Sequence, residues 1–124
     1  MKEIAIGASD EMTIGTTAEM GVAHLPAPMY STPAMVGHFE GLCLKLLQQH
    51  LDSGETSVGY RVDVRHMAPT PIGMQVTIKG KVTEVDGRKV VFAVEAHNQS
   101  GTKIGEGIHE RRVIDMSRFS GSGG

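Results

Sequence analysis

Two ionisable side chains stand where the sequence pattern predicts buried, apolar residues. The first is Glu40, within residues 32–51, the only long segment with helical periodicity. At about 100° per residue it falls about 20° from Leu47 and Leu51, on the apolar side of that segment. A carboxylate there loses hydration, which raises its pKa unless a partner stabilises the charge. Because such breaks of pattern cluster at functional sites, Glu40 is a candidate base or nucleophile; a paired structural carboxylate is the alternative.

His66 is the second such residue, and it ends the alternating segment 58–66. Alternation in a strand places every second residue on one face, and His66 is in phase with the apolar positions. A single histidine in phase with core residues is usually structural, but a position near Glu40 would make it a proton donor or acceptor. The face predicted to be buried carries Val58, Tyr60, Val62, Val64 and His66, and the opposite face carries Arg61, Asp63 and Arg65.

Thr32 and Pro33 predict the start of the helix. A threonine hydroxyl can accept from a free backbone N–H as an N-cap, and a proline at the first helical position loses no hydrogen bond. Capping alone would explain Thr32. The apolar face of the predicted helix spans about 200°, which indicates a helix wrapped by other elements. That face carries Val36, Phe39, Leu42, Cys43, Leu44, Leu46, Leu47 and Leu51.

Strands account for most of the remaining chain. Asp86-Gly87 predicts a tight hairpin turn, and a phase break between Val82 and Val85 predicts a β-bulge. One helix followed by a long antiparallel meander predicts an α+β fold, in which an antiparallel sheet wraps around one long central helix; this is the hot-dog architecture. The predicted strands are residues 4–14, 58–66, 74–85, 88–96 and 102–115.

Composition excludes several classes of function. The 124 residues are 40% hydrophobic and 21% charged, with a net charge of −2, which fits one domain, residues 1–119, and a flexible Gly/Ser tail, residues 120–124. Balanced charge and the lack of Trp argue against a nucleic-acid partner, and no apolar run reaches the ~20 residues that span a membrane. We expect a cytoplasmic protein. The His and Cys spacings predict no metal site, and Cys43 fits a small core residue better than a nucleophile.

Three stretches resemble the fluoroacetyl-coenzyme A thioesterase family of hot-dog proteins. The first runs from Thr32 to Glu40 (TPAMVGHFE), the second contains Gly59 and His66, and the third is GIHER, which ends at Arg111. In that family a Thr, a Glu eight residues later and a His twenty-six residues after the Glu form the catalytic set. Thr32, Glu40 and His66 have this spacing. The resemblance also implies a role in the site for Gly59 and for the His-Glu-Arg element.

This resemblance covers residues 10–119 and implies more than the site. Family members are homodimers whose sheets join edge to edge, with active sites at the subunit interface, and they use no cofactor besides the coenzyme A of the substrate. The family's lid before the Thr is longer and rich in aromatic residues, whereas here only residues 26–31 separate Leu25 from Thr32. The resemblance therefore extends to the reaction more than to selectivity for a fluorinated acyl group.

The expected activity is hydrolysis of a small acyl-coenzyme A thioester. A thiolate leaves readily, because its conjugate acid has a pKa near ~8.5, so oxyanion stabilisation and base catalysis should carry most of the rate. Glu40 would be base or nucleophile, Thr32 would orient it or the attacking group, and His66 would move the proton. Backbone N–H groups near the helix start and Gly59 would receive the oxyanion.

Arg111 is the first candidate to grip the coenzyme A phosphates at the mouth of the site, and Arg65 is the second. Val91 and Ala93 make the strand 88–96 apolar on its second face, which predicts at least a dimer. Two alternatives remain at this point: a non-catalytic hot-dog module that binds acyl-coenzyme A or a protein partner, and a hot-dog hydratase or dehydratase. A pure binding module would gain nothing from a desolvated carboxylate and histidine.

Overall fold

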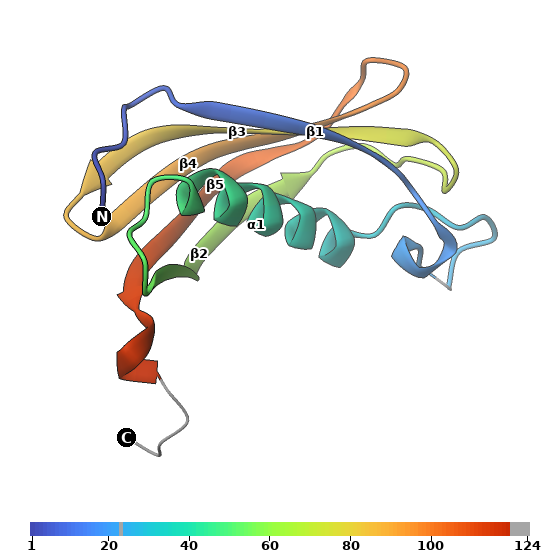
Figure 1. Cartoon of the computed structure of the whole chain (residues 1–124). Coiled ribbons are helices and arrows are strands. Elements are labelled where there is room, and N and C mark those ends of the chain that lie inside the picture. Colours follow the sequence, from blue (N-terminus) through green and yellow to red (C-terminus); the bar gives the residue numbers. More distant parts are fainter. Residues whose placement is uncertain (23, 120–124) are drawn as a thin grey trace.

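The computed structural model describes residues 1–22 and 24–119, and it shows one long helix lying along a curved five-stranded sheet (Figure 1). The predicted tail, residues 120–124, lies outside the described residues. The elements in order are β1 (Ser9–Gly15), the short 3-10 helix η1 (Ala18–Met20), α1 (Thr32–Gln48), β2 (Glu55–His66), β3 (Gln75–Asp86), β4 (Lys89–Asn98), β5 (Lys103–Asp115) and the 3-10 helix η2 (Met116–Phe119).

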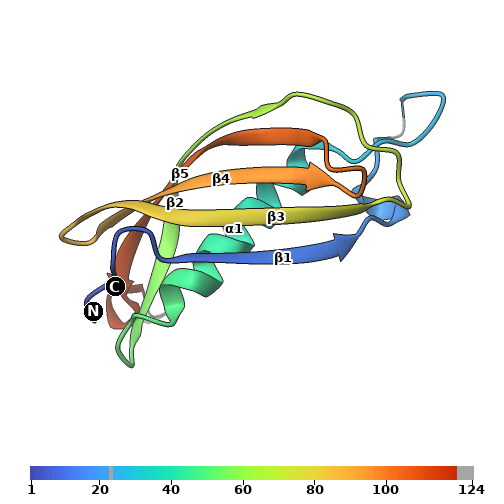
Figure 2. The ribbon, with the colours of Figure 1, turned by 90° about the horizontal axis from the view of Figure 1, so that it is seen from above.

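All neighbouring strands are antiparallel, in the order β1-β3-β4-β5-β2. Seen from above, the sheet covers the helix along its length, with β1 and β2 at the two edges (Figure 2). This confirms the predicted α+β hot-dog fold. The arrangement leaves β2 with one unpaired edge, a feature that becomes important for the site.

The helix buries one face against the sheet, as its apolar arc predicts. Leu44, which the arithmetic includes in that arc, is 37% exposed and marks the limit of the buried side. Gly105 of β5 lacks a side chain where Met35 packs, so the first turns of the helix lie close to the sheet. The buried helical residues are Met35, Phe39, Leu42, Cys43, Leu46 and Leu47.

Two strand predictions are confirmed and one is partly wrong. The β3–β4 hairpin is confirmed, although it turns at Gly87–Arg88, one residue later than the predicted Asp86-Gly87, and its pairing shifts between Val82 and Glu84, where the bulge is predicted. The first strand begins only at Ser9, so residues 4–6 lie outside it. Ile4 is nevertheless buried in the core, which explains why that segment reads as a strand.

The predicted buried face of β2 is wrong in its first half. The pairing of β2 with β5 shifts between Gly59 and Arg61, which adds one residue to β2 and reverses the alternation. In the second half, Val62 pairs with the buried His109, so Val62 faces the helix as predicted. Tyr60 instead lies on the outer face, where Arg112 stacks 4.1 Å from its ring centroid. Val58, next to it in phase, is also exposed.

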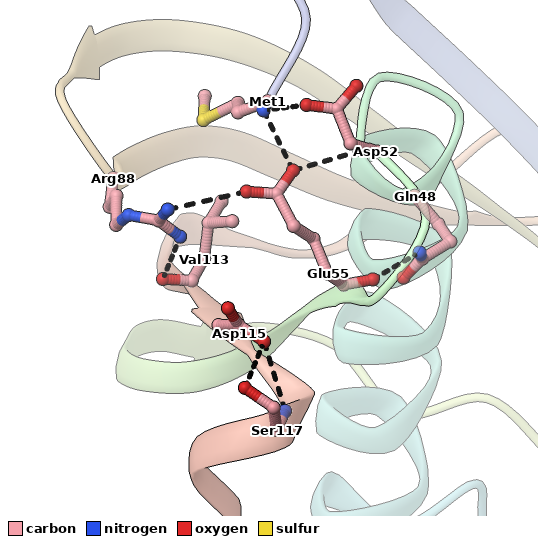
Figure 3. Close-up of polar contacts among 8 residues, drawn as sticks. All are labelled: Met1, Gln48, Asp52, Glu55, Arg88, Val113, Asp115 and Ser117. Atoms are coloured by element: carbon pink, nitrogen blue, oxygen red, sulfur yellow. Dashed lines mark hydrogen bonds and ion pairs between the residues drawn. The ribbon is translucent and has the colours of Figure 1, made fainter.

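A polar cluster joins the end of the helix to the start of β2 (Figure 3). Glu55 accepts a hydrogen bond from the backbone N–H of Asp52 at 2.9 Å and pairs with Arg88 of the β3–β4 turn at 3.4 Å. The amino group of Met1 lies 2.8 Å from Glu55 and also contacts Asp52. Gln48 donates to the carbonyl of Glu55 at 3.0 Å. These contacts fix where β2 begins, and hence the position of its far end.

Candidate active site

The helix begins at Thr32, one residue before Pro33, so the Thr32 hydroxyl is not used to cap it. Ser31 is the N-cap, because its hydroxyl accepts from the backbone N–H of Ala34 at 3.2 Å. The prediction that Thr32 caps the helix is therefore wrong. Thr32 is the first helical residue, and its hydroxyl lies 2.8 Å from Nδ1 of His66 at the end of β2.

His66 is half-buried, and burial lowers the pKa of its imidazole from the usual value. The ring is thus neutral at pH 7. Its Nε2 is buried and has no hydrogen-bond partner among the described residues. The Tyr30 ring meets it edge-on, with centroids 6.2 Å apart. Thr32 occupies one ring nitrogen, and the other is left for a reacting group.

Glu40 belongs to a second group of residues, around Gly59. A Cβ placed on Gly59 would lie 2.9 Å from Oε2 of Glu40, 3.5 Å from Cε1 of His109 and 3.7 Å from Nη1 of Arg111. All three side chains therefore pack around Gly59, and Glu40 occupies the space that a side chain at this position would need. Glu40 is half-buried and lies close enough to Arg111 for their charges to interact.

A buried hydrogen-bond network supports this second group. Arg111 donates to the hydroxyl of Ser57 at 2.8 Å and to its carbonyl at 2.9 Å. Its Nη1 lies 3.1 Å from Nε2 of His109, whose Nδ1 lies 2.9 Å from the carbonyl of Arg61. Because arginine only donates and a carbonyl only accepts, His109 is neutral with its proton on Nδ1. Burial also lowers the pKa of His109, which favours this form.

The position of Arg111 does not fit the predicted grip on coenzyme A phosphates. Its side chain is buried, and its donors are used by Ser57 and His109. The sequence pattern could not show this, because alternation alone does not give the depth of an arginine. Arg65, the second candidate, is exposed on the face of β2 opposite His66. Among the described residues, neither arginine side chain hydrogen-bonds to Thr32 or His66.

Within one chain the predicted catalytic set forms two groups rather than one. Gly59 and His66 are seven residues apart on β2, which corresponds to about 20 Å along a strand with one bulge. Thr32 and Glu40 are separated by about 12 Å of helix rise. The expected meeting of Thr32, Glu40 and His66 at one point of the same chain is therefore not found. Thr32 meets His66 at one end of β2, and Glu40 meets Gly59 near its middle.

Three residues of these groups escaped the sequence analysis. Tyr30 precedes the helix in a segment without periodicity, and nothing in its surroundings signals that it is buried beside His66. His38 lies on the polar side of the helix, yet its Nδ1 is 2.5 Å from the Tyr30 hydroxyl. Ser57 precedes the predicted strand. β2 in fact begins at Glu55, and only a strand predicted from that residue would have placed Ser57 on the same face as Gly59.

The remaining predictions concern the cysteine, metal ligands and membrane-spanning helices. Cys43 is buried in the core, and burial raises the pKa of its thiol to about 12, so it is not a nucleophile. Across residues 1–22 and 24–119, no three His, Cys, Asp or Glu side chains come together to hold a metal ion. No helix in that part of the chain is long and apolar enough to cross a membrane.

Comparisons with known proteins agree with this fold. The sequence matches the family described as fluoroacetyl-CoA-specific thioesterase over residues 9–117. The fluoroacetyl-CoA thioesterase of Streptantibioticus cattleyicolor is 37% identical over 92 residues, which are 74% of this chain and 66% of that protein's length. A solved structure of the fluoroacetyl-CoA thioesterase superposes with a TM-score of 0.89 at 30% identity, covering 95% of this chain and 93% of that one.

A thioesterase superfamily member from Thermus thermophilus superposes with a TM-score of 0.90 at 30% identity, covering 96% of this chain and 90% of that one. The helix wrapped by an antiparallel sheet and this similarity thus define a hot-dog protein of the thioesterase superfamily. More narrowly, the chain belongs to the fluoroacetyl-CoA-specific thioesterase family.

Proposed function

We propose that the protein is an acyl-coenzyme A thioesterase whose active site is completed by a second copy of the chain. The observation that carries this proposal is the pair of half-sites on β2: a neutral His66 whose Nε2 has no hydrogen-bond partner among the described residues, and a Glu40 carboxylate that packs against Gly59. Each half has part of the chemistry of thioester hydrolysis, and about 20 Å of strand separates them. A single free, buried thiol suits a reducing cytoplasm.

The unpaired edge of β2 is the surface through which two copies would join. Tyr60 is 66% exposed and Val58 and Val62 are 43% and 40% exposed, so this edge strand carries apolar side chains that a partner would cover. An antiparallel pairing of β2 with its own copy extends the sheet and closes the edge symmetrically. The predicted dimer would thus use β2, in addition to the apolar second face of β4.

We propose the register that brings the two half-sites together. With the two-fold axis at Asp63, Val64 lies opposite Val62 of the partner subunit, and both face the helices. If the extra residue of the bulge is skipped, His66 then lies opposite Gly59 of the partner subunit. Directly opposed residues in an antiparallel pair have Cβ atoms about 5 Å apart on the same face. The Thr32–His66 pair of one copy would therefore lie beside the Glu40 of the other.

In this arrangement Glu40 takes a proton from water, and the water oxygen forms a bond to the thioester carbonyl carbon. The free N–H of His66 and the positive end of the helix stabilise the oxyanion. The C–S bond then breaks, and the thiolate takes the proton back from Glu40, which restores the carboxylate. Thr32 fixes the His66 ring by its hydrogen bond at 2.8 Å, and the missing side chain at Gly59 leaves room for the Glu40 carboxylate.

The first test is a hydrolysis assay over a series of acyl-coenzyme A substrates with Glu40→Gln. This variant keeps shape and hydrogen bonding but removes the charge, so kcat should fall ~10² or more with stability near wild type. Glu11→Gln, on an exposed position of β1, is the matched control and should be fully active. A variant that melts lower but turns over normally per folded molecule would remove Glu40 from catalysis, and binding without turnover by the wild type would favour a binding module.

The second test asks which chain supplies Glu40. Glu40→Gln and His66→Asn chains are each expected to be inactive alone. When they are co-expressed, half of the dimers should be mixed, each with one intact site, which gives about a quarter of the wild-type activity. If all three residues acted within one chain, no mixed dimer would contain an intact site. Absence of recovery in dimers verified as mixed would therefore refute the shared site.

A further inference from the structure

We infer that the site takes an aliphatic acyl chain longer than two carbons, held in a cavity beside Thr32 and His66. This inference rests on the proposed thioesterase function and names its substrate class. The cavity is a groove largely open to the surface; it has a volume of about 330 Å³ and lies between the segment before the helix and the segment after β2. Besides Thr32 and His66, its main walls are Val22, Leu25, Met29, Tyr30, Met67, Ala68 and Pro69.

The walls are apolar because their polar atoms are used elsewhere. Tyr30 is 2% exposed, and its hydroxyl lies 2.5 Å from Nδ1 of His38, so it presents its ring to the cavity instead of its hydroxyl. Ser31 uses its hydroxyl to cap the helix, and Thr32 uses its own on His66. His24 is the ionisable side chain that remains in the lining besides His66. An acyl group with polar substituents would thus find few partners along most of these walls.

The cavity is large for a two-carbon acyl group. A group the size of a water molecule takes about 30 Å³ of liquid volume, so 330 Å³ holds about ten such groups. An acetyl group would leave most of this space to water. An aliphatic chain would displace that water from apolar walls, and each added methylene should raise kcat/KM about fourfold until the cavity is full.

Methionine forms two of the walls, and this indicates tolerance of shape. Met29 is half-buried and Met67 is 44% exposed, while the backbone N–H of Met67 is anchored to the carbonyl of Ile104 at 2.7 Å. Unbranched thioether side chains can change rotamer to fit different chains. We therefore expect straight and branched aliphatic acyl groups of equal carbon number to react at similar rates.

The test measures kcat/KM for acetyl-, butyryl-, hexanoyl- and octanoyl-coenzyme A with the wild-type protein. The inference predicts a rise of at least tenfold from acetyl to hexanoyl. Hydrolysis at equal or falling rates along the series would overturn the inference and leave the thioesterase function standing. Hydrolysis of none of the four would instead overturn the proposed function.

Two variants tie the preference to this cavity. Met67→Phe fills it and should lower the hexanoyl-to-acetyl ratio several-fold, while Met67→Ala enlarges it and should move the optimum to a longer chain. Met116→Phe is the matched control, since Met116 is 46% exposed on η2 outside the cavity lining, and the ratio should not change. If both Met67 variants kept the wild-type ratio, the chain would bind elsewhere and the inference would be wrong.

Discussion

Replacing His109 should separate stability from activity, because its two ring nitrogens serve different partners. Nδ1 donates to the carbonyl of Arg61 at the β2 bulge, and Nε2 accepts from Arg111. An asparagine places its amide near the former Nδ1 and can keep the contact with Arg61. A glutamine places its amide oxygen near the former Nε2 and can keep the contact with Arg111. Each variant thus loses one contact.

The two variants should lose different amounts of stability. In His109→Asn the buried guanidinium of Arg111 loses an acceptor, which costs about 1–3 kcal/mol of stability, and the smaller side chain leaves a cavity. In His109→Gln the carbonyl of Arg61 loses its donor. Arg61 is exposed, so water can replace the donor, and the cost is about 0.5–1.5 kcal/mol. We expect His109→Asn to be the less stable variant by about 1 kcal/mol or more.

Activity should follow the opposite order. The Arg61 carbonyl lies at the bulge that turns Gly59 toward Glu40, and His109 holds it in place. Without this contact the bulge can relax, and a loss of ~1.4 kcal/mol of transition-state stabilisation lowers kcat about tenfold. His109→Gln should therefore be more stable but about tenfold slower, whereas His109→Asn should be less stable but close to wild type in kcat.

Urea unfolding and steady-state kinetics on the same preparations decide the matter. Activity per folded molecule should rank wild type and His109→Asn above His109→Gln, while unfolding midpoints should rank His109→Gln above His109→Asn. If activity simply tracks stability in both variants, His109 is an ordinary core residue and the argument from the bulge is refuted.

Three further predictions follow from single contacts. Gly59→Ala places a Cβ 2.9 Å from Oε2 of Glu40, so the carboxylate must move and kcat should fall about tenfold. The melting temperature should change little, because only the end of a flexible side chain is displaced. An unchanged kcat would contradict this prediction. Burial lowers the pKa of His66, so its neutral, active form should persist below pH 6.5. The value of kcat/KM should therefore decline only below pH 6.5. A decline that begins above pH 7 would argue against His66 as the titrating group. Cys43, with its thiol pKa raised to about 12, should resist alkylation at pH 8 until the protein is unfolded, as followed by mass spectrometry.

The fold was largely predictable because its signals are local and repeated. The helix from Thr32 has a wide apolar arc, and the β3–β4 hairpin has a strong turn signal at Asp86-Gly87. Such signals depend on residues close in the chain, so they survive without knowledge of tertiary contacts. The N-cap was misassigned by one residue, since Ser31 and Thr32 are both good caps and only the tertiary contact with His66 distinguishes them.

The sequence names candidate site residues but does not predict how they are arranged in space. The bulge at Gly59 depends on how β2 pairs with β5, and no local pattern specifies the extra residue. Its consequence is large, because it reverses the faces of Val58 and Tyr60 relative to Val62. The burial of Arg111 likewise depends on its contacts with Ser57, a residue 54 positions away in the chain.

The spacing of the three candidate residues also carries no information about which chain each comes from. Eight residues of helix separate Thr32 from Glu40 by about 12 Å, and seven residues of strand separate Gly59 from His66 by about 20 Å. No side-chain rotation in a single copy closes both distances. The proposed two-fold axis through β2 would close them at once and would do so twice, because the same operation that brings Glu40 of one copy to His66 of the other also does the reverse. A shared edge would thus account for why a strand with exposed apolar residues lies beside two incomplete half-sites.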